Sequence, residues 1–424
     1  MIFNFLIFYS AYGVSISLFR KQNLEVTNAS NFEDLIFYGF VEIGTPPQLF
    51  ALQYDTGSDI MWVPSVKCEN CKQTIKFSPN DSETLIQTKR PLTIQYPSSS
   101  VSGWIVEDYV GLLGSNIHSF IPFLLVQNQQ HFEYDIIQGV MGLDNQISVQ
   151  NIFDIAYQQG LINNSIFVLQ LNQEPYQSRI YYNVTQQKIY NGTFWINSIS
   201  NHYWEITVNS VQIRDEVINL NKYNCAVLDS GSSCLYLTDE VYNTILNSLL
   251  IVCKKTLMII ECPCHPNEYE EQFLPDIIIN SNGKKFTISY KSYILQVSEY
   301  NDYCQISLRS IKRFGDLFDC MIFGDPFLFN YITIYDKQNN RIGFQNSSLE
   351  IWDITPQIID EYKIQITGLT WFSITAYFLI LGVLFYYNIE ILKAEDQESS
   401  NQDKQRVDNQ QTFVQKQQQI QQQF

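Results

Sequence analysis

Residues 54–58 read Tyr54-Asp55-Thr56-Gly57-Ser58, and residues 228–232 read Leu228-Asp229-Ser230-Gly231-Ser232. In both stretches an Asp is followed by a small hydroxyl residue, a Gly and a Ser, and then by an apolar run that contains an aromatic residue. At a similar distance after each stretch come two hydrophobic residues and a Gly, namely Val140-Met141-Gly142 and Ile322-Phe323-Gly324. The chain therefore contains a twofold internal repeat.

The repeated motif has the residue types that an acid–base site needs. Gly lets the backbone turn sharply at the end of a strand, and the hydroxyl of Thr56 or Ser230 can bond the backbone of the other copy. If the copies face each other, Asp55 and Asp229 share one proton, because two neighbouring carboxylates cannot both ionise. Such a pair can activate water for the hydrolysis of an amide without a metal or other cofactor. A single Asp-Thr-Gly indicates only a turn, whereas two copies with matching flanks favour the paired site.

The sequence resembles the pepsin-like aspartic proteases from about Phe37 to Phe344. Besides the two Asp motifs, the matching segments are Tyr38–Pro47, Trp62–Ser65, Gly139–Leu143, Gln159–Ile162, Tyr203–Ile206, Leu274–Ile277 and Phe323–Leu328. The resemblance implies an all-β, bilobal fold of two barrel-like lobes related by a pseudo-twofold axis, with the active-site cleft between them. It implies an aspartic endopeptidase that acts on a peptide or protein substrate through Asp55 and Asp229.

The resemblance also assigns roles to residues near the two aspartates. Tyr96 is matched to the tyrosine of the flap, because Gly103 follows it at the spacing that the family requires. Trp62 is expected to donate a hydrogen bond to the Tyr96 hydroxyl, and Ser58 and Ser232 are expected to steady the two aspartates. The other residues expected in the catalytic loops or the substrate site are Thr56, Gly57, Ser230, Gly231, Gln53 and Val140.

Three departures from the family pattern motivate an alternative, an inactive pepsin-like protein that binds peptides. Gln53 stands where the family has an apolar residue in the pocket before the scissile bond, and Pro97 and Ser99 replace flap glycines. Pro97 is expected to stiffen the hairpin tip, because proline fixes φ and lacks an N–H. The segment before residue 35 is also shorter and less basic than the usual propeptide. Both Asp motifs are intact, which favours an active enzyme.

The charge and the cysteines limit the possible partners and compartments. The net charge of −17 argues against a nucleic acid as partner. All nine cysteines precede residue 321, which predicts disulfides in an oxidising compartment. Cys68 and Cys71 could form a redox or half-zinc motif, but neither a following helix nor two further ligands are evident. We also expect no metal and a monomer.

The resemblance favours disulfides for the cysteines that it covers. The family commonly has a small disulfide loop after its first catalytic motif, which implies a Cys68–Cys71 bridge. Cys304 is expected to pair with Cys262 or Cys264, and we choose Cys264. The partners of Cys225, Cys234, Cys253 and Cys320 stay open, and the odd number of cysteines leaves one thiol free.

The N-terminal segment and the glycosylation motifs indicate the secretory pathway. An apolar run over residues 2–9, followed by small residues, predicts a signal peptide cleaved after Gly13 or Ser17, with an uncleaved anchor or a buried strand as alternatives. The Asn-X-Ser/Thr acceptors end at residue 346 and are Asn28, Asn80, Asn163, Asn183, Asn191 and Asn346.

The C-terminal part predicts a membrane anchor. Residues 368–387 carry no charge, and a run of about 20 such residues spans a bilayer core. Trp371 at one end and Tyr386 and Tyr387 at the other suit the two interfaces. With a cleaved signal peptide, this gives a single-pass type I protein with a luminal or extracellular catalytic domain, at the cell surface or along the secretory or endolysosomal pathway.

The expected organisation follows from these boundaries. It comprises a signal peptide (1–17), a short N-terminal segment (18–34), two protease lobes (35–192 and 193–346), a stalk (347–366), a transmembrane helix (367–388) and a Gln-rich tail (389–424).

Overall fold

The structure is a computed structural model that describes residues 14–21, 36–96, 99–130, 137–173, 177–184, 189, 192–222, 224–256, 260–296, 303–314 and 319–347. Outside these residues lie most of the expected signal peptide, the flap residue Pro97, the acceptors Asn28 and Asn191, the stalk, the transmembrane helix and the tail. Within the described ranges, no helix is long and apolar enough to cross a membrane.

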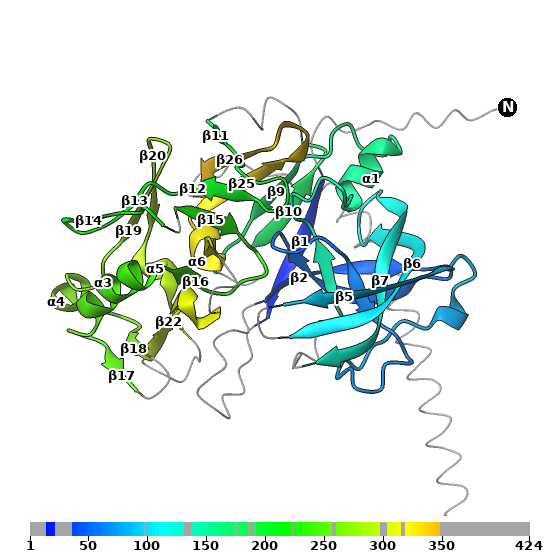
Figure 1. The fold of residues 1–424 in the computed structure, drawn as a ribbon, viewed down its shortest axis with the longest axis horizontal. Helices are drawn as coiled ribbons and strands as arrows, with labels where there is room; N and C mark the ends of the chain where they lie inside the picture. The colour runs from blue at the N-terminus through cyan, green and yellow to red at the C-terminus, as the bar shows by residue number, and fades with distance from the viewer. Residues whose placement is uncertain are drawn as a thin grey trace, which may run out of the picture. The chain divides into compact units, whose positions relative to one another are not determined.

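The first lobe is a closed ring of β-strands, on the right in Figure 1. Its strands, in the order in which they pair, are β2 (Ile36–Ile43), β3 (Gln48–Asp55), β8 (Val140–Gly142), β4 (Trp62–Pro64), β7 (His118–Gln130) and β6 (Ser100–Leu112). The ring closes because β2 pairs with both β3 and β6. Strand β5 (Ile86–Gln95) forms a hairpin with β6, which corresponds to the expected flap.

The second lobe repeats the central part of this arrangement. Its five-stranded sheet has the order β12 (Glu205–Thr207), β15 (Cys225–Leu228), β24 (Met321–Phe323), β16 (Leu235–Leu237) and β23 (Leu308–Ser310). Strand β15 runs parallel to β24, which is antiparallel to β16, and β16 runs parallel to β23. The strands β3, β8, β4 and β7 pair in the same way. The topology thus confirms the internal repeat that the sequence predicts.

The second lobe differs from the expected barrel. Its remaining strands form one sheet of β14 (Glu216–Asn219), β13 (Ser210–Ile213), β19 (Ile277–Ser281) and β20 (Lys284–Ile288), and another of β17 (Lys254–Lys255), β18 (Ile260–Pro263), β22 (Tyr303–Ile306) and β21 (Ile294–Leu295). Among the described strands, no further pairing joins β12 to β23, so this lobe is a set of open sheets. The prediction of two barrel-like lobes is right for the first lobe only.

A shared sheet joins the two lobes. It contains β11 (Phe194–Asn197), β26 (Arg341–Asn346) and β25 (Tyr331–Asp336) from the second lobe and β9 (Phe167–Gln170) and β10 (Ser178–Tyr182) from the first. The link between the lobes is β25, whose Thr333 is opposite Leu169 of β9. A backbone ladder therefore fixes the lobes against each other, and it does so next to the repeated motifs.

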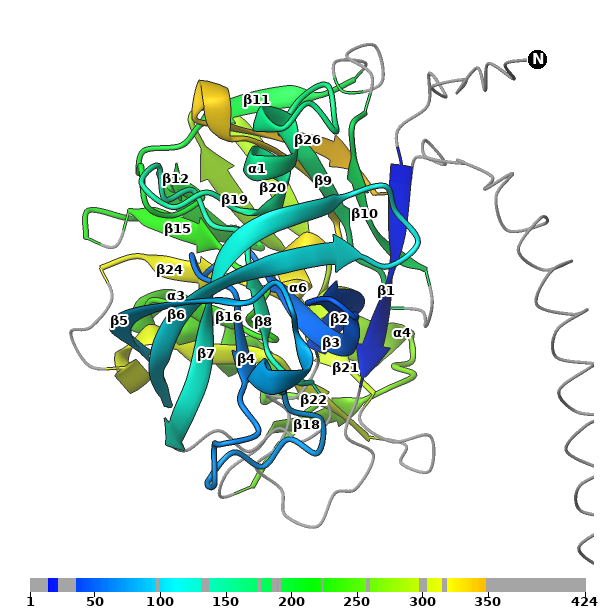
Figure 2. The same ribbon diagram turned by 90° about the vertical axis from the view of Figure 1, so that its right-hand side faces the viewer.

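The N-terminal strand β1 (Val14–Lys21) overlaps the end of the expected signal peptide. It pairs with β10 and then with β2, and Figure 2 shows it beside β10. Ile16 and Leu18 are only 6% and 1% exposed. Residues 14–17, which the sequence analysis placed in the signal peptide, are thus the first half of a paired strand, and the side chain of Ile16 lies in the core.

Among the described residues, the two longest helices are α1 and α3. Helix α1 (Ile152–Gln158) begins after Asn151, whose Oδ1 accepts hydrogen bonds from two backbone N–H groups of the first turn. Helix α3 (Asp239–Leu249) begins after Thr238, which caps it in the same manner. Shorter helices are α4 (Glu268–Glu271), α5 (Tyr290–Tyr293) and α6 (Asp325–Leu328), and 3-10 turns cover Pro79–Asp81, Ile311–Phe314 and Lys337–Asn339.

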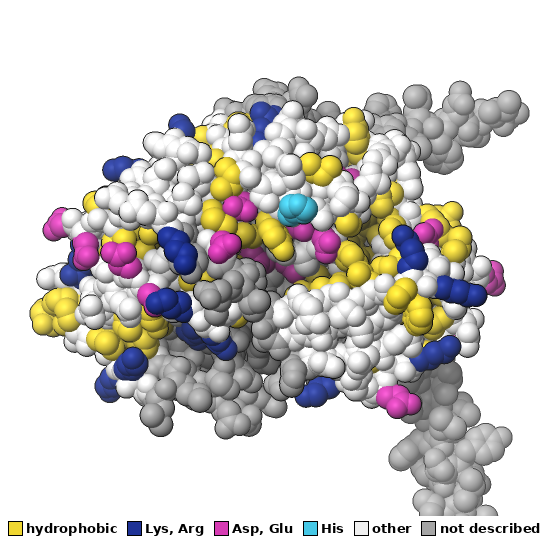
Figure 3. Space-filling view, in the orientation of Figure 1, with side chains coloured by type: hydrophobic (Ala, Val, Ile, Leu, Met, Phe, Trp, Pro, Cys, Tyr) yellow, Lys and Arg dark blue, Asp and Glu magenta, His cyan; other side chains and the backbone are white. Residues whose placement is uncertain are grey.

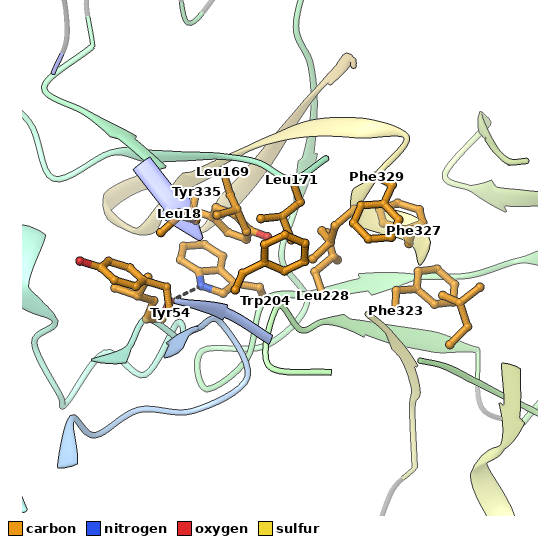
Figure 4. Packing of buried hydrophobic residues seen from close by; sticks show 14 of the residues in the cluster. Leu18, Tyr54, Leu169, Leu171, Trp204, Leu228, Phe323, Phe327, Phe329 and Tyr335 are labelled. Carbon is orange, nitrogen blue, oxygen red and sulfur yellow. Dashed lines mark hydrogen bonds between the residues drawn. The ribbon is translucent and has the colours of Figure 1, made fainter. Parts of the chain in front are cut away.

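Aromatic side chains connect the cores of the two lobes. The ring of Phe167 on β9 stacks on that of Tyr335 on β25, with centroids 4.7 Å apart. Trp204 packs edge-on against Tyr335, with centroids 5.0 Å apart, and its Nε1 donates to the carbonyl of Leu143 at 2.8 Å. Figure 4 shows this cluster continuing to Phe323 and Phe327 of the second lobe. One continuous apolar core therefore underlies both repeated motifs.

The structure contains the two expected disulfides, Cys68–Cys71 and Cys264–Cys304. Two further bridges, Cys225–Cys320 and Cys253–Cys262, pair cysteines whose partners the sequence analysis left undecided. Cys234 is buried and takes part in none of these four bridges. The Cys225–Cys320 bridge joins the starts of the parallel strands β15 and β24, which lead into Asp229 and Gly324.

Replacing Cys225 and Cys320 together by Ser should destabilise the protein by about 2–4 kcal/mol, because the bridge closes a loop with a sequence separation of 95. The matched control is the double Ser variant of Cys68 and Cys71, whose separation is 3 and whose loss should be smaller. Urea midpoints of the oxidised proteins measure both effects. Equal losses in the two variants would contradict the account based on loop closure.

Candidate active site

Two hydroxyl side chains tie the repeated motifs together across the lobe junction. Thr56 Oγ1 donates to the carbonyl of Leu228 at 2.9 Å and accepts from the N–H of Ser230 at 2.9 Å. In return, Ser230 Oγ donates to the carbonyl of Tyr54 at 2.7 Å and accepts from the N–H of Thr56 at 3.0 Å. Thr56 and Ser230 are 0% and 2% exposed. This exchange of hydrogen bonds places Asp55 and Asp229 on opposite sides of one junction.

The glycines of the two motifs allow the aspartates to approach each other. A Cβ atom added to Gly57 would lie 2.5 Å from the Cγ and Oδ1 atoms of Asp229. A Cβ atom on Gly231 would collide in the same way with the carboxyl group of Asp55. Any other residue at these two positions would push the opposing aspartate out of place.

The two aspartates receive different hydrogen bonds. Asp55 Oδ1 accepts from the N–H of Gly57 at 2.8 Å, and its Oδ2 accepts from Ser58 Oγ at 2.5 Å. Asp229 Oδ1 accepts from the N–H of Gly231 at 2.8 Å. Asp55 thus accepts a side-chain hydrogen bond from its own loop in addition to the backbone bond that both aspartates accept.

Ser232 does not have the partner that the repeat implies. Its Oγ donates to the carbonyl of Cys234 at 3.2 Å, although the sequence analysis expects it to steady Asp229 as Ser58 steadies Asp55. Its own carbonyl accepts from the N–H of Asp325 at 2.9 Å. The hydroxyl therefore helps to fold its own loop, and the twofold symmetry of the motifs is broken at this position.

Burial and a neighbouring charge shift the pKa of the aspartate pair. Burial raises the pKa of the Asp229 carboxyl well above its usual range, and the charge of Asp55 and a hydrogen bond shared with Asp55 add to this rise. The bond from the Gly231 N–H lowers the same pKa but does not reverse the shift. The two carboxyl groups therefore titrate as a unit, and the pair keeps one proton over a wider range of pH than two isolated carboxyl groups would.

The flap tyrosine has the neighbour that the resemblance implies. Trp62 Nε1 donates to the Tyr96 hydroxyl at 2.8 Å, and both residues pack in a cluster with Val140. Burial and the negative charge of Asp55 raise the pKa of Tyr96, so its hydroxyl stays protonated. The N–H of Tyr96 donates to the carbonyl of Ser99 at 2.8 Å at the end of the β5–β6 hairpin.

Gln53 makes a contact that sequence reasoning missed. Its Nε2 donates to the carbonyl of Gly231 at 3.2 Å, across the lobe junction. The side chain is only 8% exposed. The residue type is unusual for a buried strand position, and this is the signal in the sequence that could have suggested a specific partner.

Two more acidic residues beside the pair also went unnoticed in the sequence. Asp144 is 5% exposed, and its N–H donates to the carbonyl of Ser58 at 3.0 Å. Burial, aided by the charges of Asp59 and Asp55, raises the pKa of Asp144 to about 7. Burial also raises the pKa of Asp59, and Asp55 adds to this rise. In Figure 3, Asp and Glu side chains gather in the hollow at the middle of the face.

One group among the described residues has the composition of a metal site, namely Glu205, Cys225 and Cys320. Its two sulfur atoms are joined in a disulfide, so they cannot serve as thiolate ligands. The group therefore supports no metal site while the bridge is intact.

Comparisons with known proteins agree with this geometry. The sequence profile of the family described as Eukaryotic aspartyl protease matches residues 36–347. The chain is similar to Pepsin F of Oryctolagus cuniculus, with 29% identity over 327 residues that cover 74% of this chain and 81% of the relative. It is also similar to Cathepsin D of Mus musculus, with 28% identity over 343 residues that cover 75% and 82%. A third relative, Pregnancy-associated glycoprotein 4 of Ovis aries, is 28% identical over 333 residues that cover 77% and 85%.

Asp144 should make the folded state less stable as the pH rises from about 4 to about 7. The folded protein keeps the proton of this carboxyl up to a pKa of about 7, whereas the unfolded chain releases it near the usual aspartate pKa of 3.8. Stability therefore declines over this interval, by at most about 1.4 kcal/mol per pH unit for one such group. Asp144→Asn should lose less stability than the wild type between pH 4 and 7.

Urea midpoints measured at pH 4 and pH 7 test this expectation. Asp81→Asn at an exposed position is the matched control and should behave as the wild type does. A wild-type decline that is unchanged in Asp144→Asn would show that this carboxyl is not responsible.

Proposed function

Because the chain belongs to the eukaryotic aspartyl protease family, we propose that it is an aspartic endopeptidase whose catalytic groups are Asp55 and Asp229. The observation that carries this proposal is the hydrogen-bond exchange between Thr56 and Ser230, because it brings the two carboxyl groups together. In the proposed reaction Asp55 carries the charge and Asp229 carries the proton, which is a state that general acid–base hydrolysis can use.

The proposed reaction has two steps. Asp55 takes a proton from a water molecule as the water oxygen attacks the peptide carbonyl carbon, and Asp229 gives its proton to the carbonyl oxygen. The product of this step is a neutral tetrahedral diol. Asp55 then gives its proton to the amide nitrogen, Asp229 takes a proton back from a diol hydroxyl, and the C–N bond breaks. Both carboxyl groups return to their starting states.

The residues around the pair have supporting roles in this proposal. Ser58 and the N–H of Gly57 stabilise the charge of Asp55 before the attack. Tyr96, on the flap, covers the bound peptide and excludes bulk water. Val140 lies beside Gln53 on the neighbouring strand β8 and lines the substrate site. The peptide binds in an extended form and is held by backbone hydrogen bonds.

The location of the protein belongs to the same proposal. The N-terminal apolar run acts as a signal peptide, and a cut after Gly13 would leave β1 whole, whereas a cut after Ser17 would divide it. The run at 368–387 anchors the protein in a membrane. The acceptors Asn80, Asn163 and Asn346 are exposed, which supports glycosylation on the luminal side.

The catalytic proposal predicts cleavage of acid-denatured haemoglobin by the full-length protein, purified in detergent from a secretory host. Cleavage should be inhibited by pepstatin, a peptide that resembles the tetrahedral diol. It should fall as the pH rises, because Asp229 loses its proton once the pH passes its raised pKa. Asp229→Ala should lower kcat at least about a hundredfold. A folded wild type that binds pepstatin but cleaves nothing between pH 3 and 7 would favour the inactive, peptide-binding alternative.

The proposed location predicts two properties of the protein from the same host. N-terminal sequencing should begin at Val14, since this cut keeps the buried strand β1 intact. The protein should stay in the membrane pellet after an alkaline carbonate wash, and a version that stops at residue 360 should be released. A mature N-terminus beyond residue 21, or release of the full-length chain by carbonate, would contradict the corresponding part of the proposal.

A further inference from the structure

The side chain of Gln53 reaches from the first lobe to the catalytic loop of the second. It lies on β3, two residues before Asp55, and its Nε2 donates to the Gly231 carbonyl at 3.2 Å. The alternation of the strand explains this direction. Leu52 and Tyr54 are fully buried in the core, so Gln53 and Asp55 share the opposite face of β3.

The carbonyl that Gln53 holds belongs to the turn that carries Asp229. In this turn the N–H of Ser232 donates to the Asp229 backbone carbonyl at 3.2 Å. The N–H of Gly231 donates to Asp229 Oδ1 at 2.8 Å. The peptide group between Gly231 and Ser232 therefore has its N–H bonded within the turn and its carbonyl bonded to Gln53. A displacement of this peptide group would move the N–H of Gly231 away from the carboxyl of Asp229.

At the matching position of the repeat, the second lobe has no side chain that could bond the Asp55 loop in the same way. The position that matches Gln53 in the repeat is Val227, two residues before Asp229, and a valine side chain has no donor. Asp55 instead receives the Ser58 hydroxyl at 2.5 Å, while Ser232 bonds elsewhere. One further side chain therefore hydrogen-bonds to each catalytic loop: the hydroxyl of Ser58 in the Asp55 loop and the amide of Gln53 in the Asp229 loop.

We propose that Gln53 is a positioning residue that holds the Asp229 loop in its catalytic geometry through the Gly231 carbonyl. This inference rests on the proposed peptidase activity and assigns a further residue to it. Gln53 replaces, from across the junction, the steadying role that Ser232 does not have. A neutral donor suits this place better than a lysine or arginine, because a cation beside the pair would remove the proton that Asp229 must keep.

Gln53→Leu and Gln53→Glu test the proposal with the full-length protein. The Leu side chain has a similar size but no donor, so kcat should fall about five- to tenfold at every pH, while KM changes less than twofold. A protonated Glu can donate its O–H to the Gly231 carbonyl, whereas an ionised Glu cannot. At pH 3.5 the Glu variant should therefore have a kcat within about twofold of the wild type. At pH 6 it should fall below the Leu variant.

Several ionisable groups near position 53 also enter the pH comparison. They are Asp55 on the same strand, Asp229 in the facing loop, Tyr38 opposite on β2, Asp59 and Asp144 along the first loop, and Tyr96 on the flap. All of them are present in the wild type and in both variants. Each variant is therefore reported as its ratio to the wild type at the same pH, which leaves the effect of residue 53.

Titration of the active sites with pepstatin gives the competent fraction of each preparation, so kcat refers to folded enzyme only. Gln158→Leu, at an exposed position of α1, is the matched control and should keep the wild-type kcat. If Gln53→Leu does not fold, the pH-dependent ratio of Gln53→Glu decides alone. A wild-type kcat in Gln53→Leu, or the same ratio for Gln53→Glu at pH 3.5 and 6, would overturn the proposal. An inactive wild type would instead refute the peptidase activity itself.

Discussion

The exchange of hydrogen bonds between Thr56 and Ser230 is the constraint on which the rest of the site depends. Each hydroxyl bonds a backbone carbonyl and a backbone N–H of the opposite copy. Both side chains are buried, so breaking one bond would leave polar groups without partners in a dry interior. The two lobes can therefore meet in one register only, and the shared sheet of β9 and β25 holds the same register on the far side of the core.

The two repeated motifs are bonded to each other symmetrically, but the further side chains that hydrogen-bond to the two catalytic loops differ. Asp55 receives a hydroxyl from its own loop, whereas the Asp229 loop is held by an amide from the other lobe. Two carboxyl groups that share one proton need such a difference, because identical surroundings would leave the proton on either oxygen with equal probability. Burial and the charge of Asp55 both raise the pKa of Asp229, and the unequal donors act in the same direction. In the proposed reaction, the division of roles between acid and base arises from positions where the repeat is imperfect.

The acidity of the chain fits an enzyme that works at low pH. Asp144 and Asp59 are packed beside the catalytic loops, and burial raises the pKa of each. A carboxyl group that holds its proton in the folded state favours folding in acid and opposes it near neutrality. The net charge of −17 adds self-repulsion at neutral pH that protonation relieves. Stability and the proposed chemistry therefore favour the same range of pH.

The sequence by itself determined the repeat, the positions of the paired aspartates and the mainly β fold. These features depend on local spacing and residue type, which a single chain displays directly, whereas the two expected disulfides followed only from the family resemblance. Only the tertiary structure decided that β1 is buried, that the second lobe stays open, that Cys225 pairs with Cys320, and that Gln53 rather than Ser232 supports the Asp229 loop. Each of these depends on which distant residues meet in space, and a buried glutamine or an odd cysteine carries no mark of its partner in the sequence.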